Sequence, residues 1–224
     1  MKIRRLIVMA AALASALLAG GCATSRSEVR LAAPGAAAAA APAAPAAGAK
    51  VAVIRSVKDE RVFEQAPAEP STPSLGFEGA DQATGEVKAR AIGRKRNSWG
   101  KALGDILLQP GQTVEGVVRE NLGAALRDAG FDVRDDAGSA AAPLLLDVRI
   151  QRFWAWMQPG FWAITLKARI ATELQVSAGD RPVNIAVEVE DPRGLATDGA
   201  WIETIDKGLV AFRREAAAKL AALK

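Results

Sequence analysis

Residues 144–176, LLLDVRIQRFWAWMQPGFWAITLKARIATELQV, decide the fold of this chain. Apolar and polar residues alternate through them, which is the period-two pattern of strands with one dry face and one wet face. Near the middle, Gln158-Pro159-Gly160 supplies the fixed proline φ and the glycine freedom that a chain reversal needs. The stretch therefore predicts one long β-hairpin with an aromatic tip.

Two further strands extend this hairpin into a sheet. Residues 183–189 alternate in the same way and predict a third strand, which completes an antiparallel meander. Residues 50–58 are apolar on both faces and predict an N-terminal strand in the middle of the sheet. A further short strand is expected at residues 131–134.

Amphipathic stripes predict two helices, at residues 113–129 and 199–223. Gly130 ends the first helix, and Phe131 is expected to fold back on Leu126, as beside a glycine C-cap. The fold class is therefore α+β, with an antiparallel sheet packed by two helices. Four leucines on the dry faces are predicted to be buried: Leu122, Leu126, Leu166 and Leu209.

Two regions between these elements have weaker patterns. Residues 59–84 contain several prolines and glycines without periodicity, and are interpreted as a loop that is either functional or mobile. Residues 85–108 are interpreted as a second hairpin that turns near residues 97–100, with a helix over residues 86–96 as the alternative. This second hairpin holds the most basic run of the domain: Lys88, Arg90, Arg94, Lys95, Arg96 and Lys101.

The chain begins with the layout of an export signal. Residues 1–21 have a basic start, an apolar run and small residues before Cys22. The letters LAGGC at residues 18–22 resemble the bacterial lipobox; an ordinary signal peptide with an incidental cysteine is the alternative. The lipobox resemblance implies cleavage before Cys22 and attachment of fatty acyl chains, palmitate among them, which together anchor the protein in a membrane. Residues 22–49, rich in Ala and Pro, are then a flexible tether to a periplasmic domain at residues 50–224.

Composition argues against several classes of function. The formal net charge of +4 includes three basic residues of the signal, so the chain after it carries about +1, and no nucleic-acid partner is implied. The chain has no His and no Tyr, and Cys22 is its single cysteine. The usual general bases, nucleophiles and soft metal ligands are therefore missing, and we expect no enzyme, metal or cofactor. A carboxylate pair remains, but the candidates are interpreted as solvated charges: Glu188, Glu190, Asp191, Asp135 and Asp136.

The aromatic residues give one candidate site and the basic run gives another. Phe153 and Phe161 have the opposite phase to the core residues and are expected to be exposed at the hairpin tip, whereas the tryptophans there either cap the core or join the same patch. Such a patch predicts docking of an envelope protein, a lipid or a glycan. The basic run is either a solvated edge or a contact for anionic headgroups. The docking candidates are Phe153, Trp154, Trp156, Phe161, Trp162 and Trp99.

From about residue 51 to residue 223, the order of elements and the phrase GQTVEGVVRENLGAALRDAGFDV resemble YajG-type envelope lipoproteins. The resemblance implies a small α+β domain tethered to the outer membrane of a Gram-negative bacterium and facing the periplasm, and it brings no catalytic residue. A non-enzymatic lipoprotein that binds or scaffolds an envelope component is therefore expected. An auxiliary lipoprotein of an ABC or lipid transport system, which is similar in layout, is the alternative; a cell-wall hydrolase is a third.

The lipobox makes a direct prediction. Replacing Cys22 by Ser should abolish acylation and leave the signal uncleaved or aberrantly cut, because the thiol is the site of the first acyl transfer. Ala23 rather than Asp follows the cysteine, so outer-membrane sorting is expected. Metabolic labelling with a radioactive fatty acid measures both points after membrane fractionation. Absence of label on the unmodified chain would exclude a lipoprotein.

Overall fold

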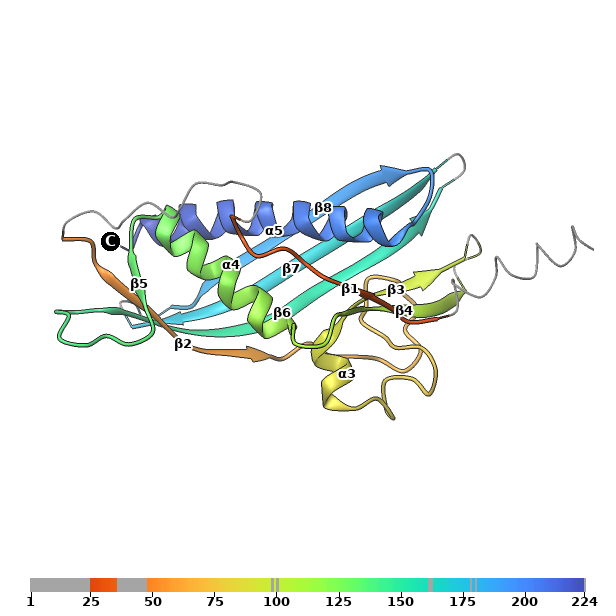
Figure 1. The fold of residues 1–224 in the computed structure, drawn as a ribbon, viewed down its shortest axis with the longest axis horizontal. Coiled ribbons are helices and arrows are strands. Elements are labelled where there is room, and N and C mark those ends of the chain that lie inside the picture. The colour runs from red at the N-terminus through yellow and green to blue at the C-terminus, as the bar shows by residue number, and fades with distance from the viewer. Residues whose placement is uncertain are drawn as a thin grey trace, which may run out of the picture.

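The computed structural model describes residues 25–35, 48–97, 99, 101–160, 163–177, 179 and 181–223. These residues form an α+β domain in which an eight-stranded, mostly antiparallel sheet packs against three helices (Figure 1). Within them, no helix is long and apolar enough to cross a membrane. The expected export signal, Cys22, Phe161 and Trp162 lie outside the described residues.

The long hairpin is the centre of the sheet, as predicted. Strand β6 (Leu144–Pro159) pairs antiparallel with β7 (Ile164–Val176) along nearly its whole length. Strand β7 pairs antiparallel with β8 (Val183–Arg193), which completes the meander.

The other edge of β6 is shared by two groups of strands. Its first half pairs with β2 (Val51–Asp59), which in turn pairs with β5 (Asp132–Arg134). Its second half meets β3 (Ala91–Arg96), followed outward by β4 (Ala102–Leu108) and β1 (Ser27–Val29). Strand β2 runs parallel to β5 and β6, so the expectation of an antiparallel sheet is wrong on this side. We call the point where β6 changes partner from β2 to β3 the strand fork.

Each helix begins at a threonine whose side chain accepts a hydrogen bond from the first turn, which satisfies a backbone donor that has no partner within the helix. Helix α4 (Val114–Asp128) ends as predicted: Gly130 has φ +84°, and the Phe131 N–H donates to the Leu126 carbonyl at 2.9 Å. The other helices are α3 (Gly85–Arg90) and α5 (Asp198–Ala221), and the capping residues are Thr84, Thr113 and Thr197.

Helices α4 and α5 lie together on one face of the sheet (Figure 1). The four leucines predicted to be buried are all within this core. Helix α5 approaches the sheet closely at Gly208, where an added Cβ would lie 3.5 Å from Ile170 and 3.7 Å from Ala168. Small residues at this contact let the helix bury its apolar stripe against β7 and β8.

A β-bulge in β6 reverses the sheet face to which each side chain of the hairpin tip points. Ile150 pairs with Thr172 and Arg152 pairs with Ala171, so Gln151 is an extra residue on β6. Beyond it, Phe153 turns into the main core and is 1% exposed. The prediction that Phe153 is exposed is therefore wrong, because the bulge moves every later side chain to the opposite face.

The same phase change puts Trp154 and Trp156 on the sheet face that α4 and α5 do not cover. There they form a second core with Leu75 and neighbouring apolar residues. Residues 60–84, which have no helix or strand, cover this face: Phe63 contacts Trp154 edge-on at 6.0 Å, and the Pro70 carbonyl accepts from Trp154 Nε1 at 3.2 Å. Trp154 and Trp156 are therefore buried, as one interpretation of the sequence predicted, but they lie beneath residues 60–84 and not in the core that α4 and α5 cover.

The region before β4 combines both interpretations of the sequence. Residues 85–90 form α3, and residues 91–108 form the second hairpin, which turns at residues 97–101. Strands β3 and β6 come close at Gly93, where a Cβ would lie 2.9 Å from the Ala155 carbonyl oxygen. Glycine is therefore required for this strand contact.

Residues 25–35 are part of the domain. Strand β1 pairs in parallel with β4, and Val29 and Leu31 are 3% and 1% exposed. The side chain of Gln112 holds both backbone polar groups of Leu31: Oε1 accepts from its N–H at 3.2 Å, and Nε2 donates to its carbonyl at 2.9 Å. The tether expected over residues 22–49 is therefore interrupted by a docked strand.

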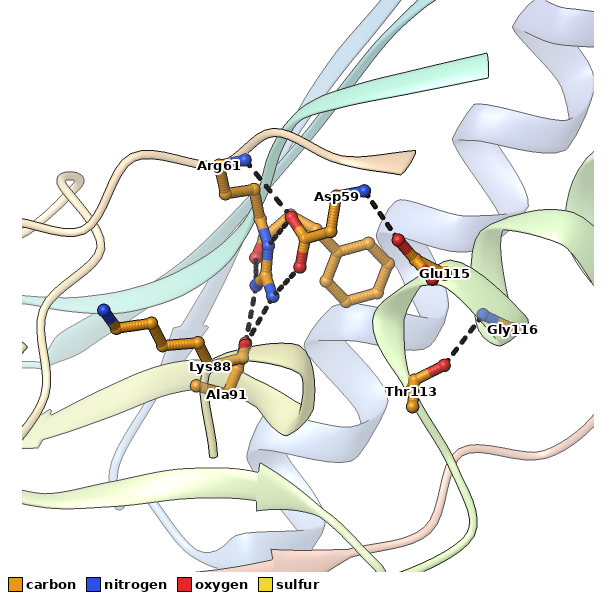
Figure 2. Close-up of polar contacts among 8 residues, drawn as sticks. Asp59, Arg61, Lys88, Ala91, Thr113, Glu115 and Gly116 are labelled. Atoms are coloured by element: carbon orange, nitrogen blue, oxygen red, sulfur yellow. Dashed lines mark hydrogen bonds and ion pairs between the residues drawn. The ribbon is translucent and has the colours of Figure 1, made fainter. Parts of the chain in front are cut away.

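Arg61 fills the strand fork (Figure 2). Its side chain is fully buried; Nη1 donates to the carbonyls of Ala91 (2.6 Å) and Phe153 (3.0 Å), and Nη2 donates to the carbonyl of Lys88 (2.8 Å). Nε and Nη2 also donate to the two carboxylate oxygens of Asp59. All five guanidinium N–H groups thus have acceptors, which is the condition for burying an arginine at a tolerable cost.

Replacing Arg61 by Ala should destabilise the domain by about 3 to 5 kcal/mol, because it leaves Asp59 and three carbonyls without their donor. Chemical denaturation measures the free energy of unfolding of the wild type and the variant. Arg152→Ala, which removes an exposed arginine close by on β6, is the matched control and should change stability by less than about 0.5 kcal/mol. Equal losses in the two variants would show that the fork does not depend on Arg61.

Candidate binding groove

A cavity of about 650 Å³ lies between β1, the β3–β4 hairpin, the end of β6 and the start of α5. We call it the end groove. It is positioned by the strand pairing of β1 with β4 on one side and by the Thr197 cap of α5 on the other. Its described lining consists of Ser25, Arg26, Ser27, Lys95, Arg96, Leu103, Met157, Ala196, Thr197, Asp198 and Trp201.

The polar lining of the end groove is mainly cationic. Three side chains, Arg26, Lys95 and Arg96, are basic, whereas Asp198 is the acidic residue among the described lining residues. Lys95 Nζ lies 3.8 Å from an Asp198 carboxylate oxygen and also donates to the Ser27 hydroxyl. With Asp105 beside Arg26 and Asp198 beside Lys95, two carboxylates lie against these three cations, and the remaining positive charge favours an anionic ligand.

Arg26 is tied to the core through Asp105. Arg26 Nε donates to Asp105 Oδ2 at 3.1 Å, and the Asp105 side chain is fully buried. Asp105 Oδ1 also accepts from the Gly76 N–H at 2.7 Å, and the Arg26 guanidinium lies 4.4 Å from the centre of the Phe77 ring. Arg26 is therefore held in place by the domain, although it is on the surface.

The other part of the lining is apolar. Leu103, Met157 and Ala196 surround Trp201, which is fully buried at the first turn of α5. The Trp201 Nε1 donor is buried and has no hydrogen-bond partner among the described residues. A groove that combines cations with an apolar wall suits a ligand that is anionic at one end and apolar at the other.

Burial affects two arginines of β3. Desolvation lowers the pKa of Arg94 from its ordinary value, and the nearby Asp105 carboxylate partly opposes this effect. Desolvation also lowers the pKa of Arg96, and the positive charge of Arg94 lowers it further. A negative charge close to these two arginines would offset the electrostatic cost of their burial.

The structure separates the predicted basic run into different sites. Lys95 and Arg96 line the end groove, and Lys101 is exposed at the β3–β4 turn. Arg94 donates to the Ser74 hydroxyl at 3.2 Å on the loop side. Arg90 is buried, where its Nε donates to the Leu108 carbonyl at 2.8 Å and its guanidinium pairs with Glu28. The prediction of Arg90 as a surface contact is therefore wrong.

Lys88 and the aromatic candidates are also separated. Lys88 is half-buried on α3, and its carbonyl accepts from Arg61. Trp99, at the β3–β4 turn, is 91% exposed and is the most exposed of the large apolar side chains described. Phe153, Trp154 and Trp156 are buried, so they cannot form a docking patch.

Three of the five carboxylates that were considered for catalysis have cationic partners, whereas Asp135 and Asp136 are exposed. Glu188 pairs with Arg169, and Glu190 lies 2.6 Å from Lys167 Nζ. Asp191 is buried and accepts from Arg193 at 2.6 Å and Lys207 at 2.9 Å. Hydrogen bonding from Arg193, followed by that from Lys207, lowers the pKa of Asp191.

Part of the groove was not found by sequence reasoning. Arg26 and Ser27 lie within the residues predicted to be a tether, and Trp201 is not among the residues predicted to be buried. The buried stripe of α5 includes Trp201 rather than Ile202, which is only partly buried. A bulky aromatic residue four positions after the Thr197 cap was the signal that could have identified it.

Asp191→Asn should lower the stability at neutral pH by about 2 kcal/mol, because hydrogen bonds to charged donors are lost. Ionised Asp191 stabilises the fold above the ordinary aspartate pKa, and this contribution disappears as pH falls through the lower folded pKa. The stability difference between wild type and variant should therefore shrink below about pH 4. The free energy of unfolding, measured from pH 7 to pH 3 for wild type and variant, tests this expectation. Glu188→Gln is the exposed control. A stability difference that does not change with pH would contradict the role given to Asp191.

Comparison with known proteins identifies no family. No protein-family model matches the chain, and no curated protein matches it. A solved structure of a Xanthomonas campestris protein of the DUF330 family is similar with a TM-score of 0.43 and 12% identity, covering 89% of this chain and 95% of that one. A second, described as an uncharacterized protein, has a TM-score of 0.37 and 12% identity, covering 78% and 97%. At these values the likeness assigns no function to the end groove.

Proposed function

We propose that this chain is a non-enzymatic lipoprotein of the outer membrane, anchored through Cys22, whose periplasmic domain binds an envelope lipid with an anionic headgroup in the end groove. Membership of the YajG-type family of envelope lipoproteins, which the sequence resembles, is part of what we propose. The observation that supports it is the lining of the groove, where cations and apolar side chains meet in one cavity of about 650 Å³. An acidic headgroup would lie beside Arg96 and Lys95, and acyl carbon would contact Leu103 and Met157.

The proposed ligand class follows from the two halves of the lining. A purely polar anion would leave the partly exposed Leu103 and Ala196 in contact with water, whereas a purely apolar ligand would remove water from the charged side chains of Lys95 and Arg96. An anionic lipid avoids both costs. Its headgroup oxygens would also offer acceptors to charged donors, which bind anions more strongly than neutral donors do.

The same lining favours binding over hydrolysis of a wall polymer. Glycoside hydrolysis uses two carboxyl groups on opposite sides of the bond that breaks. In the end groove Asp198 is the acidic residue among the described lining residues, and Lys95 lies beside it. An auxiliary role in lipid transport is the second candidate, because a lipid-binding groove on an anchored domain is what such a role requires.

A photo-crosslinking amino acid at Leu103 tests the groove in living cells. The expected product is a covalent adduct with the mass of an anionic lipid, because Leu103 is in the wall that acyl carbon would contact. The same amino acid at Ser139, which is exposed in the loop between β5 and β6 at the other end of the sheet, is the control (Figure 1). It should give no lipid adduct.

A charge variant makes this experiment specific. Arg96→Gln should reduce the lipid adduct at position 103 severalfold, whereas Arg152→Gln, on an exposed part of β6, should leave it unchanged. A protein adduct at position 103 without a lipid adduct would show that the groove binds a protein partner instead of a lipid. No adduct at position 103, or equal adducts at positions 103 and 139, would overturn binding in the end groove.

A further inference from the structure

The segment that follows the proposed acylation site is fixed to the domain. Val29 and Leu31 are buried, and the Gln109 N–H donates to the Val29 carbonyl at 2.9 Å. Two side-chain hydrogen bonds from Gln112 hold Leu31, and Glu28 pairs with buried Arg90. The contacts come from Arg90 of α3 and from Gln109 and Gln112 between β4 and α4, and together with the pairing of β1 to β4 they make residues 27–29 a strand of the sheet.

Docking of β1 limits how far the domain can stand from its anchor. Cys22 is three residues before Ser25, the first described residue of this segment, so the two are at most about 11 Å apart along a fully extended chain. A free tether of residues 22–49 would have allowed a much greater separation. The membrane that holds the acyl chains is therefore close to the N-terminal end of β1.

The direction of β1 determines which end of the domain is near the anchor. Strand β1 runs parallel to β4, with Ser27 opposite Ile106 and Val29 opposite Leu108. Its N-terminal end therefore lies toward the start of β4, which is the side of the β3–β4 turn. Figure 1 shows β1 beside β4 at this end of the molecule, away from β5.

The side chains at this end are of the kinds found at bilayer surfaces. Trp99 in the turn is 91% exposed, Lys101 beside it is exposed, and Arg26, Lys95 and Arg96 are in the adjoining end groove. Folding gains little from an indole that is exposed to water, whereas tryptophan is favoured at the level of lipid headgroups. Basic side chains are attracted to anionic headgroups over the same short distance.

We infer that the β3–β4 turn, with Trp99 at its tip, rests on the anionic surface of the bilayer that holds the Cys22 acyl chains, so that β1 clamps the domain against the membrane. The inference rests on the proposed acylation of Cys22. It goes beyond that proposal because it fixes the orientation of the domain and opens the end groove toward the lipid. Acyl chains and a basic, aromatic surface then act as two simultaneous attachments to the same membrane.

Depth measurement on the acylated full-length protein tests the orientation. Cys22 is the single cysteine of the sequence and its thiol would be acylated, so Trp99→Cys provides a unique site for the fluorophore NBD. In vesicles of phosphatidylethanolamine and phosphatidylglycerol, the label at position 99 should shift to the blue and be quenched by spin-labelled lipid. The matched control, Ser139→Cys, is at the opposite end and should keep its emission in water. Equal responses at the two positions would overturn the inference.

A spacer before β1 tests whether the docked strand, and not acylation of the chain alone, holds the β3–β4 turn on the membrane. A Gly/Ser insertion of about 20 residues before Ser25 has an end-to-end distance of roughly 25 Å and should leave the fold intact. If the strand clamp holds the turn on the surface, the blue shift and quenching at position 99 should fall severalfold, and more in phosphatidylcholine than in anionic vesicles. An unchanged signal in phosphatidylcholine would overturn the clamp.

The acylation result distinguishes the two proposals. If radioactive fatty acid is absent from the protein, the proposed lipoprotein function fails together with the clamp. If the label is present and the fluorophore at position 99 stays in water, the lipoprotein function stands and the orientation is wrong.

Discussion

The buried pair of Arg61 and Asp59 holds the two parts of the sheet together. Strand β2 ends at Asp59, and β3 meets β6 at a single pair, Gly93 with Ala155. Between them Arg61 donates to carbonyls of α3, β3 and β6 while Asp59 neutralises its charge (Figure 2). The Asp59 N–H also donates to Glu115 Oε1 at 2.8 Å, which joins the fork to the first turn of α4. Besides its apolar packing, the hairpin that carries the end groove is thus attached to β6 through one guanidinium group and one strand pair.

The parts of the fold that could be predicted depend on local patterns. The meander and helices α4 and α5 follow from the period of apolar residues, and the end of α4 follows from Gly130. The reversal at Gln151 could not be predicted, because a bulge arises from pairing between two strands and leaves no mark in the alternation of one of them. Phe153 was misplaced for this reason alone.

The candidate site was less predictable than the fold. Its lining comes from four segments that are distant in sequence, including β1, whose three residues are too short to show a period. The basic run was recognised, but sequence spacing could not tell Arg90, which is buried behind β4, from Arg96, which lines the groove. Two cations of one basic run thus have different surroundings that only the folded sheet determines.

The parallel pairing of β1 with β4 has a mechanical consequence in the proposed anchored protein. A pull on the chain before Ser25 acts along β1, so the bonds between the two strands are loaded together, in shear, instead of being opened one after another. Val29, Leu31 and the Gln112 side chain add resistance directly behind the strand. Tension at the lipid would consequently act on the β3–β4 hairpin and on the strand fork as long as β1 stays paired.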